Sequence, residues 1–106
     1  MGELPQVVVR VEPDGTAVVV CSGEFDIDTG GTLARACAGD AADAKVLIVD
    51  LGLVTFGDSS FLNELLRVRR QRPVILAGPI PAQFRKVLEM TGALALFDVR
   101  EDPRRA

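Results

Sequence analysis

The fold is decided by the stretch Val46-Leu-Ile-Val-Asp-Leu-Gly-Leu-Val-Thr-Phe-Gly-Asp-Ser-Ser-Phe-Leu-Asn-Glu-Leu-Leu-Arg67. The apolar run Val46 to Val49 predicts a strand, which passes into a short Gly-containing turn. Apolar residues at helical spacing begin directly after Asp58-Ser59-Ser60, so a helix is predicted to start there. Asp58 or a serine can accept hydrogen bonds from the free N–H groups of the first helical turn. The same N–H groups and the helix dipole also favour a phosphate, although capping alone explains most serines at such positions.

Two β-rich runs upstream of this stretch predict an antiparallel hairpin. They cover Gln6 to Val11 and Thr16 to Cys21. Between them, Glu12-Pro-Asp-Gly15 is typical of a tight turn, because proline presets the backbone and glycine tolerates a positive φ. A second turn is expected at Gly23.

A helix and a central strand are predicted next. Asp26 or Asp28 can cap a helix that runs to about Ala38. Its inward-facing residues are expected to be Leu33, Ala36 and Cys37. The following strand, Val46 to Asp50, is continuously apolar at its start, which suits a central strand covered on both faces.

The helix that follows Asp58 should be amphipathic and should end before Pro73. Its inward side is predicted to carry Phe61, Leu62, Leu65, Leu66 and Val68. Its solvent side is predicted to carry Asn63, Glu64, Arg67 and Arg70. The arginines near its end oppose the negative pole of the helix dipole, and we favour this interpretation over a partner-binding patch.

The last third of the chain predicts a strand, a helix and a strand. Val74 to Ala77 forms the first strand, a helix with Phe84, Val87 and Leu88 inward ends at Gly92, and Phe97 to Arg100 adds the last strand. The order strand, strand, helix, strand, helix, strand, helix, strand implies an α/β domain whose later strands are parallel.

Size and composition favour one domain that spans residues 1–106, with its core in about residues 5–100 and a frayed tail at 102–106. The chain has 106 residues, of which 48% are hydrophobic and 25% charged. No apolar run approaches the roughly 18 to 20 residues that span a bilayer, and the start lacks the features of a secretion signal. We therefore expect a cytoplasmic protein with no membrane association.

Composition also argues against several chemistries. The chain has no histidine, so zinc sites and Ser-His-Asp or Cys-His catalysis are not expected. Cys21 and Cys37 are interpreted as small core residues. Residues 1–66 hold 3 basic and 11 acidic side chains, whereas residues 67–106 hold 9 and 4. Nucleic-acid binding is poorly supported, because the chain is acidic overall and has no Tyr or Trp for stacking.

Three segments resemble the STAS family of bacterial anti-sigma-factor antagonists. The hydrophobic strand, Val54-Thr55-Phe56-Gly57-Asp58-Ser59-Ser60 and the leucine-bearing helix are similar to the family signature. Gly23-Glu24-Phe25-Asp26 is similar to the family's Gly-Glu-Leu-Asp turn. Phe84 to Val99, with Thr91-Gly92 and Leu96-Phe97, resembles the closing helix and strand. The three matches occur in the family's order and cover roughly residues 5–100.

The resemblance implies a STAS-like α/β domain, with a mixed, mostly parallel sheet of about five strands and helices packed mainly on one face. Ser59 matches the family's phosphorylated residue, and Ser60 is the second choice. The partner would be an anti-sigma factor that is also a serine kinase, with a separate phosphatase, no cofactor and no catalysis by the chain itself. The implied partner-binding residues are Glu24, Asp26, Asp58, Ser60, Phe61, Asn63, Glu64 and Arg67.

One position departs from the family pattern. The family usually carries Gly directly after the serine or threonine pair, whereas this chain has Phe61. A phenyl ring there could clash with a partner's backbone or could itself supply the contact. A non-phosphorylated STAS interaction module therefore stays open as an alternative. A small nucleotide-binding or phosphotransfer enzyme is a weaker one, because the chain lacks the usual phosphate-binding loops. The oligomeric state is left open.

Overall fold

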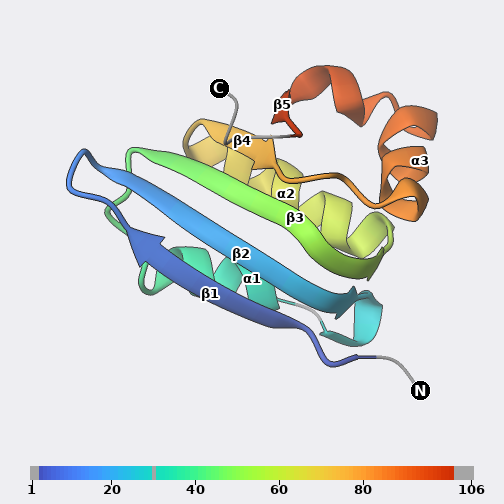
Figure 1. The fold of residues 1–106 in the computed structure, drawn as a ribbon, viewed down its shortest axis with the longest axis horizontal. Coiled ribbons are helices and arrows are strands. Elements are labelled where there is room, and N and C mark those ends of the chain that lie inside the picture. The colour runs from blue at the N-terminus through green and yellow to red at the C-terminus, as the bar shows by residue number, and fades with distance from the viewer. Residues whose placement is uncertain (1–2, 30, 102–106) are drawn as a thin grey trace.

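The strands form one mixed sheet in the order β1-β2-β3-β4-β5 (Figure 1). The computed structural model describes residues 3–29 and 31–101. β1 and β2 are antiparallel, and every other neighbouring pair is parallel. The predicted order of strands and helices and the parallel pairing of the later strands are confirmed. The described strands are β1 (Gln6–Val11), β2 (Thr16–Phe25), β3 (Val46–Gly57), β4 (Val74–Ala77) and β5 (Asp98–Arg100).

The helices connect the parallel strands. They are α1 (Thr32–Ala38), α2 (Ser59–Gln71) and α3 (Ala82–Met90), with the short 3₁₀ helices η1 (Ile27–Thr29) and η2 (Ala93–Leu96). In Figure 1, α1 and α2 lie behind the sheet, and α3 lies beside the end of β3 that leads into α2. α3 ends just before Gly92, as predicted. The expected frayed tail at 102–106 lies outside the described residues.

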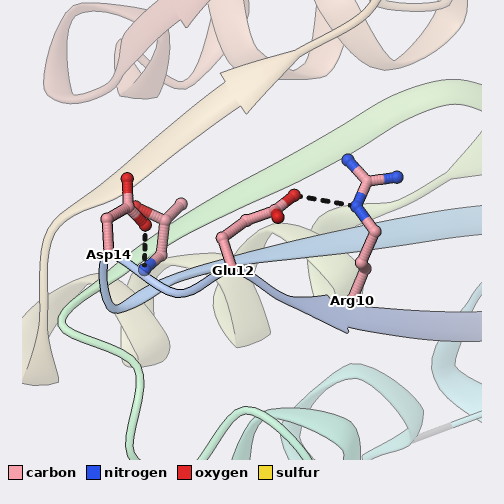
Figure 2. Close-up of polar contacts among 4 residues, drawn as sticks. Arg10, Glu12 and Asp14 are labelled. Atoms are coloured by element: carbon pink, nitrogen blue, oxygen red, sulfur yellow. Dashed lines mark hydrogen bonds and ion pairs between the residues drawn. The ribbon is translucent and has the colours of Figure 1, made fainter.

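The hairpin between β1 and β2 closes as the turn residues predict. The Glu12 N–H donates to the Thr16 carbonyl at 2.7 Å, and the Gly15 N–H donates to the Glu12 carbonyl at 3.2 Å. The Asp14 carboxylate accepts from the Thr16 N–H at 2.9 Å, which lowers the pKa of this exposed carboxyl (Figure 2). Figure 2 also shows Arg10 Nε donating to Glu12 at 2.9 Å. Local side-chain bonds therefore fix this turn.

One core lies between the sheet and the helices. Burial alternates along β2, where Ala17, Val19, Cys21 and Phe25 are buried and their neighbours are half-buried. β3 alternates in the same way over most of its length. The expectation that this central strand is covered on both faces is wrong, because the helices pack mainly on one face and the other keeps contact with solvent.

β2 and β3 are longer than predicted. β2 continues past Cys21 to Phe25, and β3 continues past Asp50 to Gly57, so the turns expected at Gly23 and after Asp50 belong to strands. The two strands stay paired through two register shifts. At Gly23, φ is +86° and a side chain would collide with the Leu4 backbone. Pairing between distant segments thus overrides the local turn signals.

α1 begins later than predicted. Asp26 and Asp28 do not cap it, and the chain forms η1 first, in which Asp26 Oδ1 accepts from the Asp28 N–H at 2.9 Å. The residue before α1 is Gly31, which offers no side-chain cap within the described chain. The start of α1 therefore depends on groups from elsewhere in the fold.

Candidate functional site

Asp58 caps α2 at the point where the sequence predicts a helix start. Its Oδ1 accepts from the backbone N–H groups of Ser60 at 2.8 Å and Phe61 at 3.3 Å. The capping group is therefore the carboxylate and neither serine. Ser59, the first residue of α2, is exposed, and Ser60 is half-buried. Within the described residues, no hydrogen bond holds the Ser59 hydroxyl.

The backbone before Asp58 is held from two sides. The Asp58 N–H donates to the Phe25 carbonyl of β2 at 3.2 Å. On the other side, the Gly57 N–H donates to Gln83 Oε1 at 2.9 Å, and Gln83 Nε2 donates to the Gly57 carbonyl at 2.7 Å. Sequence reasoning missed Gln83, because it lies 26 positions away and no local pattern connects it to Gly57.

Phe61 points into the core. Its side chain is fully buried, and its ring stacks on Phe25 with centroids 4.4 Å apart, while the Phe84 ring lies at 5.2 Å. The expectation that this ring clashes with a partner or contacts it directly is corrected by this position. The ring instead occupies space beside Gly57, where a Cβ would lie only 3.0 Å from Phe61 Cδ2 and 2.8 Å from Phe84 Cδ1. Glycine at position 57 and phenylalanine at position 61 are thus complementary in volume.

Glu64 was expected on the solvent side of α2, and that expectation is wrong. The residue is 7% exposed, and its Oε1 accepts from the Ala34 N–H at 3.2 Å. The reason is that α1 packs against this side of α2. The first turn of α1 has no side-chain cap at Gly31. The carboxylate therefore satisfies a free N–H of α1.

The remaining predicted contact residues lie on the surface near Ser59 or farther along α2. Glu24 and Asp26 are half-buried, and the pairing of Phe25 with Gly57 brings them to the same end of the sheet as Ser59. Asn63 and Arg67 are exposed on α2, as predicted. The structure thus brings the acidic residues at and just after the end of β2 to the same end of the sheet as the start of α2. Their contact with a partner stays a prediction.

The arginines at the other end of α2 serve the fold. Arg72 donates to the carbonyls of Ala41 at 2.7 Å and Ala44 at 3.1 Å, and Arg69 Nε donates to the Leu96 carbonyl at 2.6 Å. These bonds attach the end of α2 to the segments before β3 and β5. They give at least two of the arginines a structural role far from Ser59.

The described part of the chain offers no other reactive cluster. It contains no group of three or more His, Cys, Asp or Glu side chains that could hold a metal ion. Cys21 and Cys37 are buried free thiols, and burial raises the pKa of both. None of the described helices is long and apolar enough to cross a membrane.

The chain was compared with family models, curated proteins and solved structures. No family model and no curated protein matches the chain. Among solved structures, an anti-sigma factor antagonist from Mycobacterium paratuberculosis is 27% identical, with a TM-score of 0.78 over 95% of this chain and 89% of its own. The anti-sigma factor antagonist SpoIIAA in its unphosphorylated form is 20% identical, with a TM-score of 0.71 over 89% and 87%.

These likenesses confirm the resemblance to STAS-domain anti-sigma factor antagonists. They also confirm the predicted fold class, a mixed and mostly parallel sheet with helices packed mainly on one face. The structural neighbours are anti-sigma factor antagonists, and each aligns over nearly its whole length. The site at the start of α2 can therefore be considered in the light of that role.

Proposed function

We propose that this chain is an anti-sigma factor antagonist that works by partner switching in the cytoplasm. With Ser59 unmodified, the surface around it binds an anti-sigma factor that is also a serine kinase, and a sigma factor is released. The kinase transfers the γ-phosphoryl group of ATP to Ser59 Oγ, with loss of ADP and the hydroxyl proton, and the complex dissociates. A phosphatase hydrolyses the phosphate ester and restores the serine. The chain itself catalyses no step.

The observation that supports the proposal is that Asp58 caps the helix while the neighbouring Ser59 stays exposed. Asp58 caps α2, so the exposed Ser59 hydroxyl is not needed to start the helix. A phosphate on Ser59 would lie near the positive pole of α2, which favours an anion, while Asp58 continues to hold the N–H groups of Ser60 and Phe61. The fold can therefore tolerate the modification, and its effect falls on the docking surface.

Phosphorylation should weaken docking through charge and bulk. It adds about −1.5 to −2 charge at neutral pH. The new charge joins Glu24, Asp26 and Asp58 at the same end of the sheet. A partner surface that fits the neutral hydroxyl then meets repulsion and a desolvation penalty. If these effects total roughly 3 to 4 kcal/mol, affinity falls several hundredfold.

We assign the docking surface to exposed or half-buried residues around Ser59, and the buried Phe61 and Glu64 support it from inside. Because the Phe61 ring points inward, it leaves the surface beside Ser59 unobstructed. The loss of the family's Gly at this position is therefore compatible with a partner's close approach. The surface residues are Glu24, Asp26, Asp58, Ser60, Asn63 and Arg67.

The test uses the purified chain, ATP and a serine-kinase anti-sigma factor from the same organism. We expect phosphate on Ser59 by mass spectrometry, none on Ser59→Ala, and normal labelling of Ser60→Ala. Ser59→Asp should lose several hundredfold in affinity for the kinase. Gln71→Asp is the matched control, because Gln71 is exposed at the opposite end of α2. No phosphate on Ser59, together with undiminished binding by Ser59→Asp, would reject the mechanism.

Two other functions predict different results. A non-phosphorylated interaction module would bind its partner equally well as Ser59→Asp, and intact-mass analysis of protein from its native cell would find no phosphate. A nucleotide-binding enzyme would show a higher melting temperature on addition of nucleotide. The Ser59 hydroxyl is exposed and has no hydrogen-bond partner among residues 3–29 and 31–101, which favours the switch over both.

A further inference from the structure

Near the site, no described strand pairs with the edge of β3 that faces β4. β4 pairs with β3 only from Leu47 to Asp50, whereas β3 runs on to Gly57. At Gly57 the side-chain amide of Gln83 takes the place of a strand. It accepts from the Gly57 N–H at 2.9 Å and donates to the Gly57 carbonyl at 2.7 Å. One side chain thus satisfies both backbone groups of the last residue before the cap of α2.

We propose that Gln83 is the positioning residue of the switch site. Its amide fixes Gly57 and thereby sets the direction in which Asp58 and Ser59 leave the sheet. This inference rests on the proposed function, because the placement of Ser59 matters only if a kinase must reach it. Gln83 itself touches neither the phosphate nor the reacting hydroxyl in this scheme.

The chemistry of the contact explains why an amide is needed. Gly57 requires one acceptor and one donor at neighbouring positions, which is how a peptide group of an adjoining strand would meet it. A neutral amide provides both. An ionised carboxylate of the same shape accepts from the N–H but repels the carbonyl, and an aliphatic side chain leaves both buried groups unpaired.

The neighbouring residues place the amide beside Gly57, although Gln83 itself is exposed. Gln83 lies in the first turn of α3, and the next residue, Phe84, is fully buried against Phe61. On the opposite side of β3, Phe25 pairs with Gly57 and accepts from the Asp58 N–H at 3.2 Å. The start of α2 is therefore held between β2 and α3. Removal of the amide releases one of these two supports.

The first experiment needs no partner and measures amide hydrogen exchange by NMR. At pH 7, Gln83→Ala and Gln83→Glu should each lower the protection of the Gly57 N–H at least tenfold relative to the wild type. Protection of Leu76 in β4 should stay unchanged. At about pH 4, Gln83→Glu should recover toward the wild type at that pH, because a protonated carboxyl can donate again. Gln71→Ala, at the far end of α2, is the matched control and should change nothing.

Two exchange results would overturn the inference. One is a Gly57 protection in Gln83→Ala within twofold of the wild type. The other is a Gly57 N–H protection at pH 4 that is equal in Gln83→Glu and Gln83→Ala. If the side chain only filled space, protonation of the introduced carboxyl would restore no protection.

The second experiment measures phosphorylation of Ser59 by the serine-kinase anti-sigma factor of the preceding test. Gln83→Ala should lower kcat/KM at least tenfold, with the loss mainly in KM, whereas Gln71→Ala should behave like the wild type. Circular dichroism of the variant should stay that of the folded wild type. An unchanged kcat/KM in folded Gln83→Ala would overturn the inference. If the wild-type chain itself receives no phosphate, the proposed function fails, and the exchange data still decide whether Gln83 positions the loop.

Discussion

The ring of Phe61 stacks on the ring of Phe25, with centroids 4.4 Å apart and planes 24° from parallel. Phe25 is the last residue of β2, and Phe61 lies in the first turn of α2, so the pair joins the acidic end of β2 to the start of the helix. Phe84 of α3 adds a third ring at 5.2 Å from Phe61. The residue that departs from the family pattern is therefore a core residue that ties together the elements around Ser59.

Replacing this ring by the residue usual in the family should destabilise the fold. Phe61→Gly should lower the free energy of unfolding by about 3–5 kcal/mol through the cavity. Glycine inside the first turn of α2 should remove up to about 1 kcal/mol more. Urea unfolding measures the difference, with Phe56→Ala as a control on a ring that is 36% exposed. A loss in Phe61→Gly no greater than that in the control would contradict the packing role.

Gly57→Ala should also destabilise the protein, because the added methyl group has no free space. Its Cβ would lie 2.8 Å from Phe84 Cδ1 and 3.0 Å from Phe61 Cδ2. We expect a loss of about 1–3 kcal/mol in the free energy of unfolding. In a Phe84→Leu background the same substitution should be less harmful, since the nearest ring is gone. If the effects of Gly57→Ala and Phe84→Leu on the free energy of unfolding simply add, the rings do not limit the space at position 57.

Glu64 should matter as a hydrogen-bond acceptor. Glu64→Ala leaves the Ala34 N–H without its carboxylate, and we expect a loss of about 1–3 kcal/mol in the free energy of unfolding. Glu64→Gln keeps an acceptor oxygen and should lose less than half as much. Asn63→Ala, at the exposed neighbouring position, is the control. Equal stabilities of the Ala and Gln variants would argue against the capping contact.

Asp58 should contribute a normal helix cap. Asp58→Ala should lower the free energy of unfolding by about 1 kcal/mol, whereas Asp58→Ser retains a capping oxygen and should lose only part of that. Asp40→Ala changes an exposed carboxylate outside α2 and should have little effect. Chemical denaturation compares the three variants. If Asp58→Ala is as stable as Asp40→Ala, the cap does not start this helix.

The two thiols should make stability fall in alkaline solution. Burial raises the pKa of Cys21 and Cys37 in the folded chain, and the nearby Arg72 partly opposes this at Cys37. Above the ordinary cysteine pKa of about 8.5, the unfolded chain loses thiol protons that the folded chain keeps. Unfolding is then favoured by up to about 1.4 kcal/mol per pH unit for each thiol.

Urea unfolding between pH 8 and 10 tests this expectation. The double variant Cys21→Ala/Cys37→Ala should show a much flatter pH dependence than the wild type, although its stability at pH 7 is lower. The chain has no Tyr or His to obscure the comparison. Identical slopes for the two proteins would show that the thiols do not titrate differently in the folded and unfolded states.

Local signals in the sequence determined the order of the elements and several of their ends. The Asp14-Gly15 turn, the start of α2 after Asp58 and the bounds of β4 were all predicted correctly. Each depends on hydrogen bonds within a few residues or on the period of a single strand or helix. The fold class followed from this order together with the family resemblance. Such features can be predicted because the interacting groups are neighbours in the chain.

Tertiary contacts decided what lies around Ser59. The extension of β2 and β3, the burial of Glu64 and the support of Gly57 by Gln83 each join segments that are 26 or more positions apart. Helical periodicity places Glu64 on one side of α2 but says nothing about α1 packing there. Helical periodicity correctly placed Phe61 on the inward side of α2, but its fit to the space beside Gly57 and to the rings of Phe25 and Phe84 appears only in the structure. These outcomes are set by packing volume and by the need to pair buried polar groups, which exist only once distant segments have met.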